Sequence, residues 1–274
     1  MQTSTWARLS IPGTQLAEAR LQCHHAAQIN TRLARGFVAA QPDDSHTNLE
    51  WDTAAGALTG RPVSSFRLGL RIADLTLLLL APSGETTADF PLDGRTFQDG
   101  LSWLGERLRA LGLDPAPLAQ PIHFSLDDHP LLHGAAFRFK GREPLFLELA
   151  KWYGNAALAL DFTSAPVRCW PHHFDIAASI VKGASSVGVG MSPGDAAYDQ
   201  PYFYVTPWPY PEAGSLPRLG LGRWQTAGWV GAVLTAGDVL AHTDQARYVQ
   251  EFLNGAVDAT SAKTNPSRST ISPV

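Results

Sequence analysis

The segment Trp170-Pro171-His172-His173-Phe174-Asp175 concentrates side chains that could do chemistry. We expect residues 173–181 to form a β-strand, which places His173 and Asp175 on one of its faces. A carboxylate raises the proton affinity of a neighbouring imidazole, so the pair indicates a general base, His173, oriented by Asp175. Both groups also bind metals, but the spacing fixes no third ligand and we assign no metal. The alternative is structural: a core histidine bonded to the backbone and an aspartate that caps a turn.

A second candidate is the segment Ser192-Pro193-Gly194-Asp195. Proline fixes φ and glycine accepts positive φ, so these residues are typical of a turn. In the functional interpretation the turn presents Asp195 at the mouth of a pocket, as a second catalytic carboxylate. In the simpler interpretation it only connects two strands of a hairpin.

A third candidate is a ladder of polar side chains on a predicted helix over residues 15–37. His24, Gln28 and Arg32 recur every four residues and therefore share one side of this helix. In the functional interpretation they line a cleft, with Arg32 as an anion clamp and His24 as a second group for proton transfer. The alternative is a polar face in contact with solvent.

Aromatic residues crowd the segment 198–229. Strand alternation places Tyr202 and Tyr204 on one face, and ligand pockets are commonly lined by aromatic rings. We therefore predict that these tyrosines contact a ligand, together with Gln28, Arg32, His172 and Trp170. A packed sheet with tyrosine hydroxyls at its rim is the alternative.

The elements that position these residues fall into two similar runs. Helices are expected over 15–37, over 96–111 with Thr96 as its cap, over 144–161 and over about 243–259. Strands are expected at 47–54, 56–63, 66–72, 75–81 and 86–90, and again at 173–181, 185–191, 202–208 and 224–235. Strands in runs indicate an α+β fold, with two similar helix–antiparallel sheet–helix halves packed as one unit. The predicted boundaries are 1–112 for the first half, 113–142 for a Pro-rich linker, 143–259 for the second half and 260–274 for a disordered tail.

Composition narrows the classes of partner. The chain of 274 residues has a formal net charge of −4 and no basic block, which disfavours nucleic acid and anionic membranes. The longest apolar run, Leu75 to Ala81, is far shorter than the roughly 20 residues that a membrane span needs. No signal peptide is recognisable at the N-terminus, and two cysteines make no disulfide framework. We therefore expect a soluble cytoplasmic protein.

Three ordered motifs of the second half resemble a bacterial family. They are Trp170-Pro171-His172-His173-Phe174-Asp175-Ile176-Ala177, Ser192-Pro193-Gly194-Asp195 and Gln200-Pro201-Tyr202-Phe203-Tyr204, and the likeness extends over most of residues 6–258. The family is catalogued as a domain of unknown function, number 5996. The chain departs from its pattern at Ala26, where a bulky aromatic is expected, and at His46-Thr47-Asn48, where relatives carry His and Trp. The resemblance implies one integral unit, but it brings no activity, cofactor or partner.

Two functions follow from these residues. The first is binding of a small molecule, an anionic one included, in a pocket lined by aromatic and histidine side chains. The second is an enzyme that uses His173, Asp175 and Asp195 for acid–base or metal chemistry. We favour binding, because no nucleophile and no complete set of metal ligands can be named. The sequence identifies no cofactor and no oligomeric state.

Overall fold

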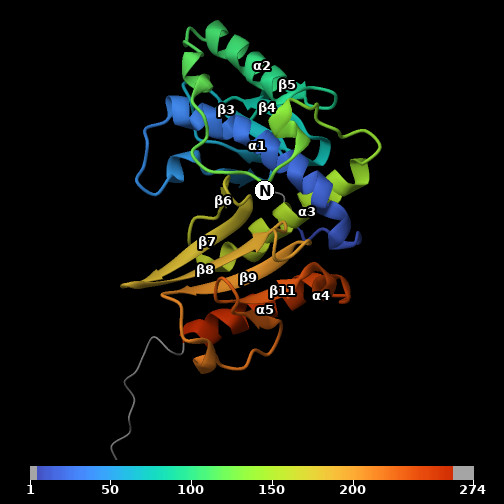
Figure 1. The fold of residues 1–274 in the computed structure, drawn as a ribbon, viewed down its shortest axis with the longest axis vertical. Coiled ribbons are helices and arrows are strands. Elements are labelled where there is room, and N and C mark those ends of the chain that lie inside the picture. Colours follow the sequence, from blue (N-terminus) through green and yellow to red (C-terminus); the bar gives the residue numbers. More distant parts are fainter. Residues whose placement is uncertain (1–4, 262–274) are drawn as a thin grey trace, which may run out of the picture.

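The computed structural model describes residues 5–261 and shows an α+β fold with two antiparallel sheets (Figure 1). A long helix precedes each sheet: α1 (Ala17–Phe37) the first and α3 (Glu143–Ala159) the second. The helix α2 (Phe97–Ala110) follows the first sheet, and α4 (Ala236–Leu240) and α5 (Gln245–Ser261) follow the second. The predicted fold class is therefore confirmed.

The first sheet is a five-stranded meander in chain order. Its strands are β1 (Glu50–Asp52), β2 (Ala57–Thr59), β3 (Arg67–Arg71), β4 (Thr76–Leu80) and β5 (Thr86–Pro91). All five lie inside or within a residue of the predicted segments, although β1 and β2 are only three residues long. The apolar run around β4 is a fully buried strand, as the sequence indicates.

The second sheet has six strands in the order β10-β11-β9-β8-β7-β6. Its strands are β6 (Arg168–Trp170), β7 (Asp175–Lys182), β8 (Ser185–Ser192), β9 (Tyr202–Trp208), β10 (Arg223–Gln225) and β11 (Gly231–Thr235). The segment predicted as one strand over 224–235 is two strands that pair with each other. The sequence analysis missed β6, whose three residues are too few to show an alternating pattern.

The two sheets meet at their edges. Leu49, just before β1, and Cys169 in β6 exchange two backbone hydrogen bonds of 2.9 and 2.8 Å. One contiguous buried core also runs through both halves, with Ile29 of α1, Trp152 of α3 and Phe203 of β9 among its members. Helix α3 contacts α1 and β1 as well as β7 and β8, so it lies between the halves.

The cap of α2, the segment 113–142 and the end of α5 were all predicted from the sequence. The cap of α2 is confirmed: the Thr96 side chain accepts from the Asp99 amide, and the Asp99 carboxylate accepts from the Thr96 amide. The segment 113–142 contains only two short 3₁₀ turns, at Ala116–Ala119 and Pro130–His133, and packs along α1. Helix α5 continues through Ser261, and the rest of the predicted tail lies outside the described residues.

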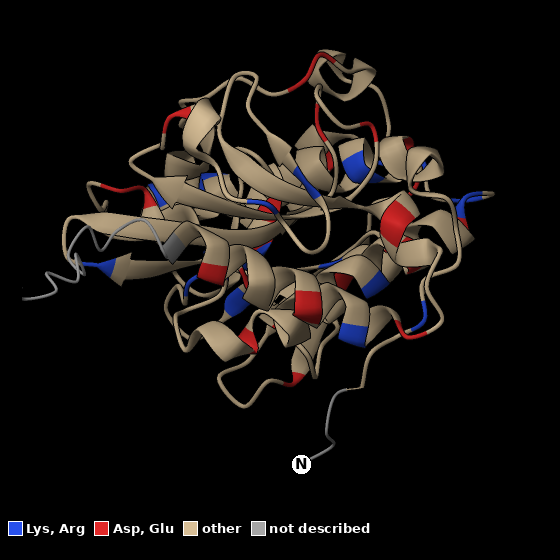
Figure 2. Cartoon of the chain, turned by 90° about the horizontal axis from the view of Figure 1, so that it is seen from below, with Lys and Arg blue, Asp and Glu red and all other residues tan. Residues whose placement is uncertain are grey.

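Positive and negative charges are mixed along the described residues. Lys and Arg positions alternate with Asp and Glu positions around the chain (Figure 2). Across residues 5–261, none of the helices combines the length and the apolar character that crossing a bilayer requires.

Candidate functional site

The candidate site lies on the face of the second sheet that the core does not cover. Antiparallel pairing brings Ala177 of β7, Gly190 of β8 and Tyr204 of β9 into one row across this face. The next row toward the β6–β7 turn holds Ser192 and Tyr202. The opposite face carries buried residues such as Val189 and Val205, which belong to the core.

A pocket of about 340 Å³ opens on this face. Five of the ten residues predicted for the site line it: His173, Asp175, Asp195, Tyr202 and Tyr204. They come from the β6–β7 turn, from β7, from the loop after β8 and from β9. The structure thus brings together side chains that lie up to 31 positions apart in the chain. Their chemical roles stay predictions.

Asp175 and Tyr204 form a half-buried pair in the pocket. The Tyr204 hydroxyl donates to Asp175 Oδ2 at 2.5 Å. Asp175 Oδ1 is also buried, and it has no hydrogen-bond partner among residues 5–261. Burial raises the pKa of Asp175 above its usual value, and the Tyr204 hydroxyl and the charge of His173 oppose that shift only in part. The lining of the pocket therefore includes a carboxyl group with one oxygen that no described donor satisfies.

Asp195 and Tyr202 form a second pair in the lining of the pocket. Asp195 Oδ2 accepts from the Tyr202 hydroxyl at 2.6 Å, while Oδ1 accepts from the amides of Ala197 and Tyr198. The aspartate therefore shapes the loop between β8 and β9 and also lines the pocket, while its catalytic role stays a prediction. Burial and the hydrogen bond to Asp195 raise the pKa of Tyr202, which keeps the phenol protonated.

Four further side chains line the pocket without having been selected from the sequence: Ser192, Thr206, Tyr210 and Trp229. The Trp229 ring lies 6.4 Å from the Tyr202 ring and 6.2 Å from the Tyr204 ring, measured between centroids. Trp229 belongs to the aromatic segment that the sequence analysis noted. Alternation along a strand could not have selected it, because it precedes β11 in an irregular segment.

The expected strand over 173–181 begins later, and this changes the setting of the histidines. Residues 171–174 form a tight turn between β6 and β7, and Phe174 has a positive φ of 58°. His173 is exposed at the pocket rim, and its ring centroid lies 4.4 Å from that of His172. Expecting His173 and Asp175 on one strand face was therefore wrong, although both side chains line the pocket. His172 lies against Trp170 and Phe124 instead, where burial lowers its pKa.

The ladder on α1 does not lie on a solvated face, as one interpretation expected. His24 and Gln28 are buried, with 5% and 1% of their surface exposed. The Nε2 atoms of both side chains lie 2.9 Å from the carbonyl oxygen of Pro171, to which they donate. Burial lowers the pKa of His24 to about 4, so its ring is neutral at pH 7. These two residues anchor the β6–β7 turn from behind and do not line the pocket.

Arg32 lies away from the pocket. Its Nη1 donates to the carbonyls of Ala119 and Gln120 at 3.1 and 2.7 Å, which ties the segment 113–142 to α1. It borders a separate hollow between α1 and α2. The predicted anion clamp is therefore not part of the pocket that contains Tyr202 and Tyr204. Trp170 lines a third hollow, which adjoins the pocket at Tyr204.

Metal binding and thiol reactivity depend on how the His, Cys, Asp and Glu side chains of the described residues are arranged. Between residues 5 and 261 no group of three or more His, Cys, Asp or Glu side chains is arranged to hold a metal ion. Cys23 and Cys169 are free and buried, and burial raises the pKa of each thiol. The pocket can therefore bind a ligand through two carboxylates, hydroxyl groups and aromatic rings.

Comparisons of the chain with protein-family models, with curated proteins and with solved structures find no match. The resemblance to the bacterial family stays a prediction, and the function is argued from the geometry of the pocket.

Proposed function

We propose that the protein binds a small molecule with a positively charged amine, and that the amine enters the pocket beside Asp175. The observation that carries this proposal is the buried Asp175 Oδ1, which has no partner among the described residues. A buried acceptor without a donor costs about 1–3 kcal/mol, so a ligand N–H placed there recovers that free energy. A cationic donor also stabilises the ionised form of the carboxyl group.

The other walls of the pocket fit the same chemistry. Its lining includes a second carboxylate, Asp195, and neither lysine nor arginine. The rings of Tyr202, Tyr204 and Trp229 surround the same space, and aromatic faces attract cations. An anionic group placed beside both carboxylates would be repelled, so this pocket favours a cation over the anion considered from the sequence.

A second candidate function is proton transfer. One observation favours it: the exposed imidazole of His173 lines the same pocket as the buried carboxylate of Asp175. A bound amine or hydroxyl group would then lie between a base and an acid. Both functions would use Asp175, but only proton transfer also needs His173, so His173→Gln distinguishes the two functions.

The test measures binding of n-propylamine, with uncharged n-propanol as the matched probe, by thermal-shift titration. We expect the amine to stabilise the protein and the alcohol to have no effect. Asp175→Asn should weaken amine binding about tenfold or more, because it removes the negative charge and keeps the shape. Asp199→Asn is the control. Asp199 is exposed in the loop that contains Asp195, and it does not line the pocket. Circular dichroism checks that each variant is folded.

The pH dependence gives an independent readout. Because the pKa of Asp175 is raised, we expect amine affinity to increase with pH as this carboxyl group ionises. Equal binding of the alcohol and the amine, or full amine binding by Asp175→Asn, would contradict the proposal. Amine binding that is lost in both Asp175→Asn and His173→Gln would favour the second candidate.

We also propose that the protein is located in the cytoplasm. Both cysteines are free thiols, as is usual in a reducing compartment, and this supports a cytoplasmic protein.

A further inference from the structure

A second hollow adjoins the pocket on the same sheet face. It has a volume of about 450 Å³ and shares Tyr204 and Thr206 with the pocket. Its other walls come from β6–β8 and, in the first half of the chain, from the segment before β1 and from Arg61 after β2. The hollow therefore lies at the junction of the two sheets, next to the Leu49–Cys169 bridge.

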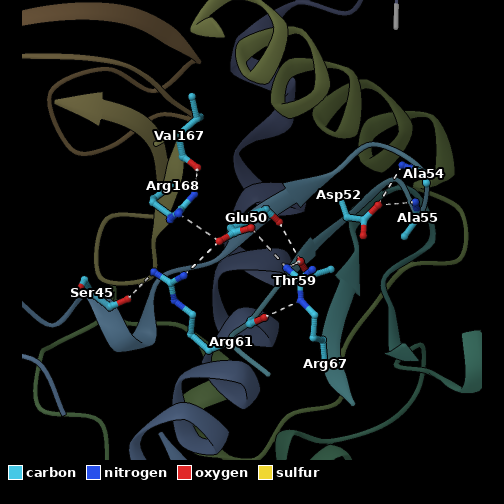
Figure 3. Close-up of polar contacts among 11 residues, drawn as sticks. Ser45, Glu50, Asp52, Ala54, Ala55, Thr59, Arg61, Arg67, Val167 and Arg168 are labelled. Atoms are coloured by element: carbon cyan, nitrogen blue, oxygen red, sulfur yellow. Dashed lines mark hydrogen bonds and ion pairs between the residues drawn. The ribbon is translucent and has the colours of Figure 1, made fainter. Parts of the chain in front are cut away.

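Three arginines gather beside this hollow around one carboxylate (Figure 3). Arg61, Arg67 and Arg168 lie 3.2, 3.6 and 3.3 Å from the Glu50 oxygens. Only Arg61 and Arg168 line the hollow, while Arg67 points to Gly60 and Thr59. Two guanidinium groups, those of Arg61 and Arg168, and one carboxylate, that of Asp43, line the hollow, so its lining has a positive net charge.

The two lining arginines keep donors that the protein does not use. A guanidinium has five N–H groups. Arg61 contacts Glu50 and the Ser45 carbonyl, and Arg168 contacts Glu50 and the Val167 carbonyl. Within the described residues these contacts leave several N–H groups on each side chain. Glu50 thus holds both guanidinium groups in place while only part of their charge is neutralised.

A buried amide side chain also forms part of the wall of the hollow. Asn48 is 1% exposed and lines the hollow. Its Oδ1 is buried and has no hydrogen-bond partner in the described part of the chain. An amide oxygen accepts hydrogen bonds and cannot donate to an anion, so an anion in this hollow would contact Arg61 and Arg168 rather than this oxygen.

We infer that this hollow is an anion subsite, and that the ligand of the pocket is a zwitterion whose phosphate or carboxylate lies against Arg61 and Arg168. The inference rests on the proposed amine site beside Asp175. Arg168 pairs with Ala177, which lies two residues along β7 from Asp175. Strand spacings then separate the backbone positions of Asp175 and Arg168 by about 8 Å, a distance that one small molecule can span.

The test compares three probes at constant ionic strength: n-propylamine, inorganic phosphate, and 3-aminopropyl phosphate, which carries both groups. Constant ionic strength removes general screening from the comparison. We expect 3-aminopropyl phosphate to bind at least tenfold more tightly than either single-group probe. Arg168→Gln should reduce its affinity to about that of n-propylamine and should abolish phosphate binding. Arg67→Gln is the matched control, because it removes the same charge beside Glu50 without changing the lining of the hollow.

Each outcome separates this inference from the proposed function. If 3-aminopropyl phosphate binds no more tightly than n-propylamine, or if Arg67→Gln weakens it as much as Arg168→Gln, the anion subsite is wrong and the amine site stands. If phosphate binding depends on Arg168 but no probe binding depends on Asp175, the amine site and the zwitterion are both wrong. Circular dichroism checks that each variant is folded. Arg61→Gln, a second lining variant, should weaken phosphate binding as Arg168→Gln does.

Discussion

His24 shows how one buried side chain can serve the site without touching its ligand. The ring stacks on Phe174, with centroids 5.2 Å apart and planes within 6° of parallel, and Nε2 donates to the Pro171 carbonyl. Because burial lowers the pKa of His24 to about 4, protonation would place a charge in the core. We assign His24 the role of positioning the β6–β7 turn.

This residue predicts how stability depends on pH. The folded pKa of His24 lies below the ordinary value of 6.5, so the unfolded chain binds the proton more tightly. Its contribution to stability is complete above pH 6.5 and is lost as the pH falls toward 4. Between pH 7 and pH 5 the free energy of unfolding should fall by about 2 kcal/mol from this residue. Urea denaturation of wild type and His24→Gln at both pH values measures it.

The control for this prediction is His133→Gln, since the His133 side chain is largely exposed. His133→Gln should keep the pH dependence of the wild type, while His24→Gln should reduce it. An unchanged pH dependence in His24→Gln would show that the imidazole is not held neutral. His25, whose pKa burial also lowers to about 4, should still contribute in the same direction.

The sequence could predict which residues share a face but not which face is buried. The alternation that paired Tyr202 with Tyr204 holds, because both lie on one regular strand. The four-residue period of His24 and Gln28 also holds, yet their side became interior because the Pro171 carbonyl offers partners there. That carbonyl belongs to a turn about 145 residues away, and no local pattern encodes it.

The glycines of strand β8 leave room for the side chains that shape the pocket. A Cβ atom at Gly190 would lie 2.6 Å from the Tyr204 ring and hydroxyl and 2.8 Å from the Ala177 Cβ. The Tyr204 ring therefore lies flat across β8, which directs its hydroxyl to Asp175. The alternation of Gly188 and Gly190 with Val187 and Val189 gives one open face and one core face.

Gly190→Ala should destabilise the protein by about 1–3 kcal/mol, because Tyr204 must leave its position or the sheet must shift. The same variant should lose the amine binding proposed above. The matched control is Gly255→Ala in α5, where nothing lies within 4 Å of the added Cβ. This control should stabilise the helix by roughly 0.5–1 kcal/mol. Urea denaturation compares both, and equal effects would contradict the proposed close packing at Gly190.

The wrong prediction around residue 173 has a physical reason. A turn without glycine or asparagine is difficult to recognise, and here Phe174 adopts the left-handed conformation that those residues favour. Its ring is buried between His24 and Tyr153, with centroids 5.2 Å away on both sides. Tertiary packing therefore overrides the local preference, and a strand starting at His173 could not have been excluded from the sequence.

At the scale of the whole molecule, the junction of the sheets predicts a single cooperative unfolding transition. The Leu49–Cys169 bridge, the position of α3 and the shared core connect the halves. In scanning calorimetry the van't Hoff and calorimetric enthalpies should agree within error. Separately expressed chains covering 1–142 and 143–274 should lack sharp unfolding transitions. Two resolved transitions, or one half that folds alone, would show that the halves are independent domains.

The class of fold was predictable because helices and runs of strands have distinct periods. The arrangement of the halves was not, because it depends on a three-residue strand, β6, and on two backbone hydrogen bonds of Leu49. The same limit applies to the anion subsite. Arg61 and Arg168 lie in opposite halves of the sequence, and only the meeting of the two sheet edges makes them neighbours.

The packing of Phe174 in the core fixes the conformation of the turn that places His173 beside the pocket. Holding a residue with a Cβ atom at φ 58° costs on the order of 1 kcal/mol, which the packing of its ring must offset. A mutation that loosens this packing, such as a smaller residue at Tyr153, would let the turn relax to an ordinary conformation. His173 and Asp175 would then move apart while most of the molecule stays folded. Core mutations near this ring should therefore reduce ligand binding before they reduce expression, and a screen based on folded yield would overlook them.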